Sequence, residues 1–349
     1  MPSRVPQHVS LHRVAGTELQ VVSDVESGLG PLIEVEKEVI ERYATSPRWR
    51  QESVTLFVLQ DLRPLSQQLS PHEATLPPGG LAGLDQRPIV NVYDLKRPAY
   101  CHVFVNREAM EKEGYWGDRE AVKALLAHEH AHPLSECETT RSARRLKADI
   151  SAKGLQPLFP PEAQAEGWLT KLDRLLVLMV DKLCLYAPRE VLANDVTIES
   201  GFVAPLLYLD RKNLRNAVEG LRARSTLRQT LQDEVKTERL TPAGADLLLS
   251  IADMKGYLDL AMETAPFYRQ NREAEGRELE GLLFGEVMPH LEPAVAEAYP
   301  RLRDAYLGLV EDASPEVLLQ WEGSLLGILA GVLNAKGLRL ECQLSVIPE

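Results

Sequence analysis

The residues best suited to chemistry are three histidines and a glutamate in the stretch LLAHEHAHPLSECE, residues 125–138. On an α-helix successive side chains turn by about 100°, so residues four apart lie one above the other. His128 and His132 then face the same way and can hold one ion, with Glu129 beside them. His130 points to nearly the opposite side and cannot share that ion. The three histidines are therefore a pair and a bystander.

His128 to His132 form an HExxH motif, which in zinc metalloproteases supplies two imidazole ligands and a glutamate that acts as general base. Zinc lowers the pKa of its bound water to about 7 and polarises the scissile carbonyl. The carboxylate takes the proton and later passes it to the leaving amine. The motif therefore predicts a Zn²⁺ site with His128 and His132 as ligands and Glu129 as base. The alternative is an incidental cluster without a metal.

A catalytic zinc needs three protein ligands and one open position, so a third ligand must come from elsewhere. Glu190 in PREVLAND is the first choice, because it begins a predicted helix. Ala193 is small enough for close helix approach, and Asn194 can hydrogen-bond either a ligating histidine or the Glu190 carboxylate. Glu162 and Glu166 in PPEAQAEGW are the rival ligands, at a shorter spacing.

HExxH followed by ExxAN resembles the motifs of the gluzincin metallopeptidases. Two branches are similar: the ImmA/IrrE type of intracellular bacterial protease, and the HtpX and CAAX-prenyl-protease group. In those families the glutamate of the second motif is the third zinc ligand, which the resemblance carries over to Glu190. The two histidine ligands carry over to His128 and His132, and the base to Glu129.

The resemblance also implies how substrate binds. In these families the edge strand just before the HExxH helix binds the substrate backbone, and that strand corresponds to Tyr100–Asn106 here. The resemblance covers only the motifs, within the region from Val54 to Phe202. Pro133, directly after the second histidine, is a departure from the family pattern.

Other side chains are weaker candidates. Tyr186, Tyr208 and His102 are possible oxyanion stabilisers, a role that a histidine, tyrosine or arginine usually fills. We expect His130 to cap the outer face of its helix or to contact a carboxylate. Cys137 is interpreted as a small buried thiol rather than a ligand.

The elements that must position these residues can be predicted from periodicity. Asp118 is a suitable N-cap for the histidine helix, which we expect to end at or near His132 because Pro133 disfavours helical geometry in the residue before it. Proline and glycine content indicates that Arg63–Pro88 is a long loop or insertion. The remaining expectations in this half are a helix at Gly30–Thr45 and strands at Val54–Leu62, Ile89–Leu95 and Tyr100–Asn106.

The rest of the chain is predicted to be mainly helical. Helices are expected from Pro160–Pro161 to about Tyr186 and from Pro188, and another after Thr241 as N-cap. The basic run Arg141–Asp149 is interpreted as a solvated helix with internal ion pairs. Residues 337–349 are expected to hold one last strand.

Composition limits the class of protein. The 349 residues carry a net charge of −12, which argues against a general nucleic-acid or membrane-surface binder. The four cysteines are scattered, as in a reducing cytoplasm rather than a disulfide framework. No run approaches the roughly 20 apolar residues needed to span a bilayer. We therefore expect a cytoplasmic protein.

Together these observations predict an α+β fold: a small mixed sheet with a zincin-like HExxH helix, followed by a mainly helical C-terminal region. The expected domains are residues 1–205 and 206–349. The expected function is a zinc-dependent peptidase with a peptide or protein substrate. The alternative is a non-catalytic, metal-stabilised binding or regulatory protein with the same fold.

Overall fold

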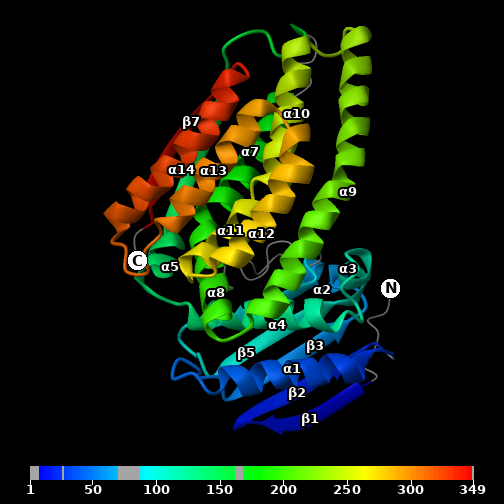
Figure 1. Ribbon diagram of the computed structural model, residues 1–349, viewed down its shortest axis with the longest axis vertical. Coiled ribbons are helices and arrows are strands. Elements are labelled where there is room, and N and C mark those ends of the chain that lie inside the picture. The colour runs from blue at the N-terminus through cyan, green and yellow to red at the C-terminus, as the bar shows by residue number, and fades with distance from the viewer. Residues whose placement is uncertain (1–7, 26, 70–85, 162–167, 348–349) are drawn as a thin grey trace. The chain divides into compact units, whose positions relative to one another are not determined.

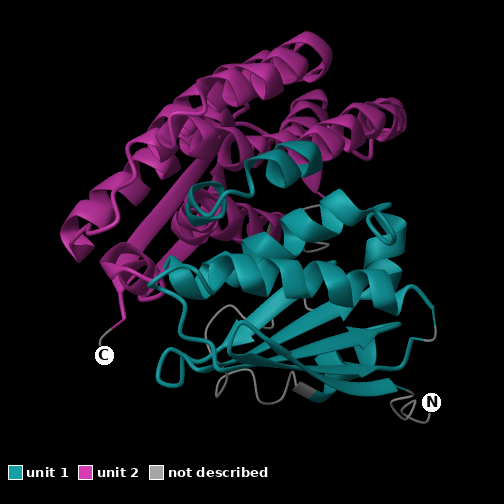
Figure 2. Cartoon of the chain, turned by 60° about the horizontal axis from the view of Figure 1, so that its bottom comes forward, with its two compact units in different colours: residues 1–135, 196–209 teal, residues 136–195, 210–349 magenta. Residues whose placement is uncertain are grey.

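The structure is a computed structural model that describes residues 8–25, 27–69, 86–161 and 168–347 (Figure 1). The fold is α+β and 61% helical, with a five-stranded mixed sheet, a two-stranded sheet and a helical C-terminal region. The chain divides into two compact units, residues 1–135 with 196–209 and residues 136–195 with 210–349 (Figure 2). The predicted domain boundary after residue 205 stays a prediction.

The first unit is built on the five-stranded sheet. Its strand order is β1-β2-β3-β5-β4. β2 pairs in parallel with β3, and β3 pairs in parallel with β5. β1 pairs antiparallel with β2, and β4 pairs antiparallel with β5. The strands are β1 (His8–Val14), β2 (Thr17–Ser23), β3 (Ser53–Leu59), β4 (Ile89–Tyr93) and β5 (Tyr100–Asn106).

The β1–β2 hairpin was not among the predicted elements. A two-residue turn joins the strands, and Ala15 and Gly16 both have positive φ, 47° and 93°. Two positive φ values are typical of the type I′ turn that matches strand twist, for which Asn-Gly or Asp-Gly is the usual sequence. Ala-Gly gives a much weaker signal, so the hairpin is hard to recognise from sequence.

The topology corrects the expected substrate-binding edge. β5 was expected to be the edge strand, but it pairs with β3 on one side and with β4 on the other. Its backbone groups are therefore used on both sides. Among the strands described, β4 (Ile89–Tyr93) forms the edge beyond β5.

Two helices cover one face of this sheet, α1 (Leu29–Tyr43) and α4 (Arg119–Leu134) (Figure 2). They pack against each other, and α4 also packs against β4. The strands present alternate residues to this face, among them Leu19, Val54 and Val103, none of which is exposed to solvent. The alternation is the period-2 pattern of a sheet that is buried on one side.

The segment predicted as a loop after β3 begins instead with a helix. α2 spans Arg63–Leu69. An Oδ1 atom of Asp61 accepts a hydrogen bond of 2.9 Å from the Arg63 N–H, and Leu65 packs against the buried cluster of Leu62 and Val90. Capping and burial thus stabilise a helix that has little periodicity. Residues 70–85 of the predicted insertion lie outside the described residues, and a further short helix, α3 (Arg107–Lys112), follows β5.

The second unit is mainly helical (Figure 1). The division between the units falls within α8, after Asp195, and within α9, after Leu209. The elements of the second unit, including the two helices that it shares with the first unit, are α5 (Glu138–Ala143), β6 (Leu146–Gly154), α7 (Trp168–Val180), the π-helix η2 (Asp181–Leu185), α8 (Ala187–Glu199), α9 (Val203–Lys236), α10 (Pro242–Tyr257), α11 (Leu260–Arg269), α12 (Glu273–Leu282), η3 (Leu283–Val287), η4 (Met288–His290), α13 (Pro293–Leu307), α14 (Pro315–Ala335) and β7 (Leu338–Val346).

Several predicted elements of this unit are confirmed. Thr241 caps α10, its hydroxyl accepting a hydrogen bond of 3.0 Å from the Gly244 N–H. The last strand is β7, which pairs antiparallel with β6. The single helix expected over Arg141–Asp149 is wrong, because α5 ends at Ala143 and Leu146 begins β6. The pairing with a distant strand supplies backbone hydrogen bonds that outweigh the local helical pattern.

One helix among the described residues, α14, is long and apolar enough to cross a membrane by length and composition. Its apolar side is buried against α13, α10 and β7. Leu318, Leu325 and Leu329 are 0% exposed, as in the core helix of a soluble protein. The molecule has the features of a soluble protein.

Candidate metal centre

The helix that carries the HExxH motif is held at its start by Asp118. The Asp118 Oδ1 atom accepts a hydrogen bond of 3.2 Å from the Ala121 N–H, which confirms the predicted N-cap. Its Oδ2 atom accepts a bond of 2.9 Å from the Tyr208 hydroxyl. Ala121, Val122 and Leu126 of α4 are buried. The cap and the apolar face therefore fix the rotation of the helix about its axis.

His128, Glu129 and His132 come together on α4. One potential ligand atom from each residue lies within 4.8 Å of those of the other two. The ring centroids of His128 and His132 are 4.7 Å apart, with the planes at 79°. His128 and Glu129 are partly exposed and His132 is buried, so the group is reachable from outside the helix. The prediction that residues four apart form the pair, with His130 outside it, is confirmed for this helix.

The end of α4 departs slightly from expectation. The helix continues to Leu134, so Pro133 lies inside its last turn rather than just beyond it. Proline has no N–H and cannot donate to the carbonyl four residues earlier, which is that of Glu129. The Glu129 carbonyl accepts instead from Asn91 Nδ2 on β4, at 3.0 Å. A side chain from the sheet thus replaces the missing helical donor.

His130 lies on the other side of α4, where its Nε2 atom is 2.8 Å from Oε1 of Glu36 on α1. Contact with a carboxylate was one of the two expectations for this residue. The other, a cap on an outer face, is wrong, because both side chains are fully buried. Histidine is expensive to bury without a partner, and Glu36 supplies that partner.

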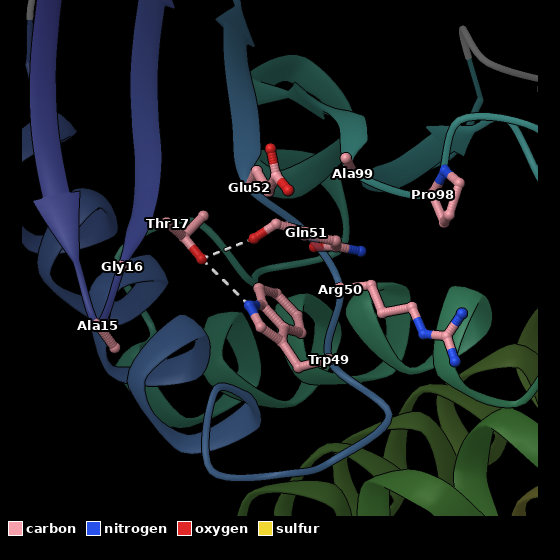
Figure 3. Close-up of a pocket in the computed structure, with 9 residues that line it drawn as sticks. All are labelled: Ala15, Gly16, Thr17, Trp49, Arg50, Gln51, Glu52, Pro98 and Ala99. Carbon is pink, nitrogen blue, oxygen red and sulfur yellow. Dashed lines mark hydrogen bonds between the residues drawn. The ribbon is translucent and has the colours of Figure 1, made fainter.

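Aromatic packing connects this side of α4 to a pocket at one end of the sheet. The Trp49 ring lies 5.7 Å from the His130 ring and is stacked on Tyr43 with an interplanar angle of 3°. The pocket, of about 570 Å³, is lined by residues 15–17, 49–52 and 98–99 (Figure 3). Figure 3 shows the Trp49 indole bonded to Thr17 Oγ1, at 3.1 Å. None of the three residues of the possible metal group lines this pocket.

Burial changes the acidity of a nearby thiol. Cys101 on β5 is buried, and its Sγ donates to Gln51 Oε1 at 3.3 Å. Desolvation, and then the negative charge of Glu36, raise the pKa of the Cys101 thiol well above its usual value. The thiol therefore stays protonated near neutral pH and is a poor metal ligand, because the thiolate is the ligating form.

The predicted third ligand and its neighbour lie on α8, in the part of that helix that belongs to the second unit. Glu190 is in its first turn. Asn194 is buried, and its Nδ2 donates to the Met262 carbonyl at 3.4 Å, which ties α8 to α11. Coordination by Glu190 and a bond from Asn194 to a histidine stay predictions. The rivals Glu162 and Glu166 lie outside the described residues.

The three candidate oxyanion stabilisers, His102, Tyr208 and Tyr186, lie on different elements. His102 faces away from α4, because the neighbouring β5 residues Cys101 and Val103 fill the helix side of the sheet. Tyr208 is bonded to the N-cap of α4, about ten residues of helix before His128, a distance of roughly 15 Å. Tyr186 follows η2 in the second unit and stays a candidate, and Cys137, expected to be buried, is half-buried at the start of α5.

The residue that the sequence reasoning missed is Asn91. Its side chain and its main-chain N–H both bond to Glu129, at 3.0 Å to the carbonyl and 2.9 Å to Oε2 of the carboxylate. Pro133 was the available signal, since a proline four residues after Glu129 leaves a buried carbonyl that needs another donor. Which donor fills that need depends on the pairing of β4 with the helix.

The side chains of this group fit a transition metal such as zinc. Imidazole nitrogen and carboxylate oxygen are zinc ligands, and two histidines one turn apart are a common pair. No protein-family model, curated protein or solved structure matches this chain.

Proposed function

We propose that the protein is a cytoplasmic, zinc-dependent peptidase that hydrolyses a peptide bond in a peptide or protein substrate. The observation that carries this proposal is the HExxH group on α4, whose three potential ligand atoms lie within 4.8 Å of one another. We extend the proposal to the fold: the mixed sheet with α4 on one face corresponds to a zincin-like domain, and the motifs resemble those of gluzincins.

In this proposal His128 Nε2 or Nδ1, the corresponding atom of His132 and the Glu190 carboxylate hold the zinc. When bound, zinc would polarise the substrate carbonyl and lower the pKa of the attacking water. The Glu129 carboxylate would accept a proton from the attacking water and deliver it to the nitrogen of the leaving amine. Asn194 orients a ligating side chain through a hydrogen bond, as partners of metal ligands usually do.

The proposed substrate path follows the edge of the sheet. In peptidases with these motifs the edge strand binds the substrate backbone, and the edge strand here is β4. An extended peptide adds to such an edge through main-chain hydrogen bonds. Asn91 lies on β4 and bonds to Glu129, so a peptide along this edge would run past the proposed base.

The test combines metal content with turnover. Purified protein from zinc-supplemented expression is expected to contain about one equivalent of zinc, and less than about half an equivalent would contradict the metal site. Cleavage is measured with a quenched-fluorescence library of random peptides. Glu129→Gln is expected to keep the zinc and to lose at least about a hundredfold in turnover, because general acid–base catalysis contributes roughly that factor.

The controls distinguish catalysis from a structural metal. His128→Ala and His132→Ala are expected to lose both zinc and turnover, whereas Glu120→Gln, on the exposed first turn of the same helix, changes neither. A wild-type protein that binds zinc tightly but cleaves no library peptide would favour the alternative, a metal-stabilised binding or regulatory protein.

A further inference from the structure

Asn91 is bonded to Glu129 at two points. Its Nδ2 donates to the Glu129 carbonyl at 3.0 Å, and its main-chain N–H donates to Glu129 Oε2 at 2.9 Å. Asn91 is only 5% exposed, so water competes little for either bond. One residue of the edge strand therefore contacts both the backbone and the carboxylate of the proposed base.

The first of these bonds exists because of Pro133. In a regular helix the carbonyl of Glu129 would accept the N–H of residue 133, but proline has none, and its ring pushes that carbonyl outward. A buried carbonyl without a donor costs about 1–3 kcal/mol. The Asn91 amide removes that cost and, in doing so, joins the last turns of α4 to β4.

The bond from the Asn91 main-chain N–H sets the orientation of the Glu129 carboxylate. Alternate residues of an antiparallel strand turn their N–H groups to opposite sides. The Asn91 N–H bonds to Glu129, so it points away from β5 and outward from the free edge of the sheet. The two oxygens of a carboxylate are rigidly joined, so holding Oε2 on this N–H also sets the direction of Oε1. A flexible glutamate side chain is thereby held in one orientation beside His128 and His132.

We propose that Asn91 is a positioning residue for Glu129, and that Pro133 creates the acceptor through which its side chain acts. This inference rests on the proposed function for its catalytic consequence. Misplacement of a reacting group by about 1 Å can cost a hundredfold in rate, so an orienting bond to the base affects turnover rather than substrate affinity. Asn91 does not need to touch the substrate for this role.

The experiment is a cycle of Asn91→Ala, Pro133→Ala and the double variant. Asn91→Ala removes the bond from Nδ2 to the Glu129 carbonyl, and kcat is expected to fall at least tenfold on the best library peptide, with KM and zinc content unchanged. Pro133→Ala restores a helical N–H and is expected to stay near the wild type. In the double variant the N–H of residue 133 takes the place of the Asn91 amide, so kcat is expected to return to within about threefold of the wild type.

Leu65→Ala is the matched control, because Leu65 on α2 packs against the same cluster of Leu62 and Val90 but lies outside the proposed substrate-binding strand. It loses packing but leaves kcat unchanged, and Pro133→Ala does not alter its effect. An Asn91→Ala variant with wild-type kcat, or one whose loss of kcat Pro133→Ala does not restore, would overturn the proposal.

A second measurement is independent of activity. Hydrogen exchange of the main-chain amide of residue 91 reports its bond to Oε2 of Glu129, with or without zinc. Exchange is expected to be at least tenfold faster in Asn91→Ala and slow again in the double variant. If that pattern appears in a protein without peptidase activity, the proposed function is wrong and the positioning stands. If the exchange rate is the same in all variants, the positioning is wrong.

Discussion

Nε2 of His130 lies 2.8 Å from Oε1 of Glu36, and neither side chain has any exposed surface. The bond joins the side of α4 opposite to the histidine pair with α1. It lies under the aromatic rings of Tyr43 and Trp49, which extend the same contact. The HExxH helix is therefore stabilised by the bond to α1 on the side opposite to the histidine pair, and by buried apolar side chains.

Removal of that bond is expected to destabilise the first unit without affecting the metal. Glu36→Ala leaves a buried imidazole without its partner, and the free energy of unfolding should fall by about 3 kcal/mol. Chemical denaturation measures this. Glu34→Ala, which breaks the exposed pair with Lys37, is the control and should change the value by less than about 1 kcal/mol. Loss of zinc from a folded His130→Ala variant would contradict the structural role of His130.

Removal of the metal is expected to lower the melting temperature. A ligand that binds only the folded state at a thousand times its Kd stabilises that state by about 4 kcal/mol. Addition of a chelator should therefore lower Tm in the wild type, and added zinc should restore it. His128→Ala/His132→Ala is the control: its Tm should not respond to chelator. A response in that variant would mean that zinc binds elsewhere.

The third ligand can be identified by a comparison of glutamates. Glu190→Gln is expected to weaken zinc binding by at least tenfold, because an amide is a much poorer ligand than a carboxylate. Glu162→Gln and Glu166→Gln should leave zinc affinity within about twofold of the wild type. Competition with a chromogenic zinc chelator gives the affinities. The reverse ranking would transfer the ligand role to the preceding segment.

The bond between Tyr208 and Asp118 is expected to be structural. Asp118→Ala removes both the N-cap of α4 and the partner of the Tyr208 hydroxyl, and should cost about 1–2 kcal/mol of unfolding free energy. Tyr208→Phe removes only the second bond and should cost about 1 kcal/mol. Its kcat should equal that of the wild type. A hundredfold lower kcat for Tyr208→Phe would restore Tyr208 as an oxyanion stabiliser.

Glu322 on α14 gives the second unit a pH-dependent stability. Burial raises the pKa of this carboxyl from 4.5 to about 8, and neither oxygen has a hydrogen-bond partner within the described residues. The folded protein therefore holds a proton that the unfolded chain releases above pH 4.5. This contribution to stability is complete below pH 4.5 and is lost as the pH rises to 8, a fall of up to roughly 5 kcal/mol.

Glu322→Gln should remove this slope, because the amide does not titrate. Denaturation curves between pH 5 and 8.5 should converge with those of the wild type at the acidic end and show the variant as more stable at the alkaline end. Glu316→Gln on the same helix is the control. The hydrogen bonds at the start of α14 lower the pKa of Glu316 below 4.5, so that variant should keep the wild-type slope. Parallel curves for Glu322→Gln and the wild type would contradict the prediction.

The sequence was informative where a local pattern determines the structure. The Asp118 cap and the four-residue spacing of His128 and His132 both depend on one helix, and the structure has them as predicted. The Thr241 cap and the final strand followed from similarly local signals.

Features that depend on distant pairing were not predictable in the same way. The position of β4 at the sheet edge depends on strand order, which neighbouring residues do not encode. The Asn91 bond to Glu129 joins residues 38 positions apart, and Glu36 meets His130 across 94 positions. The helix was expected to end near His132, so the missing helical donor to the Glu129 carbonyl became evident only when the structure showed that α4 continues to Leu134.

The β6–β7 pair has a consequence for biosynthesis. Residues 146–154 leave the ribosome long before residues 338–346, and all nine pairs of that ladder join the two segments. Until the later segment emerges, β6 has no strand partner among the described elements, and its backbone N–H and C=O groups lack their β-sheet hydrogen bonds. Nascent chains stalled between the two segments should therefore be recognised by chaperones that bind exposed strands, and released once residues 338–346 have left the ribosome.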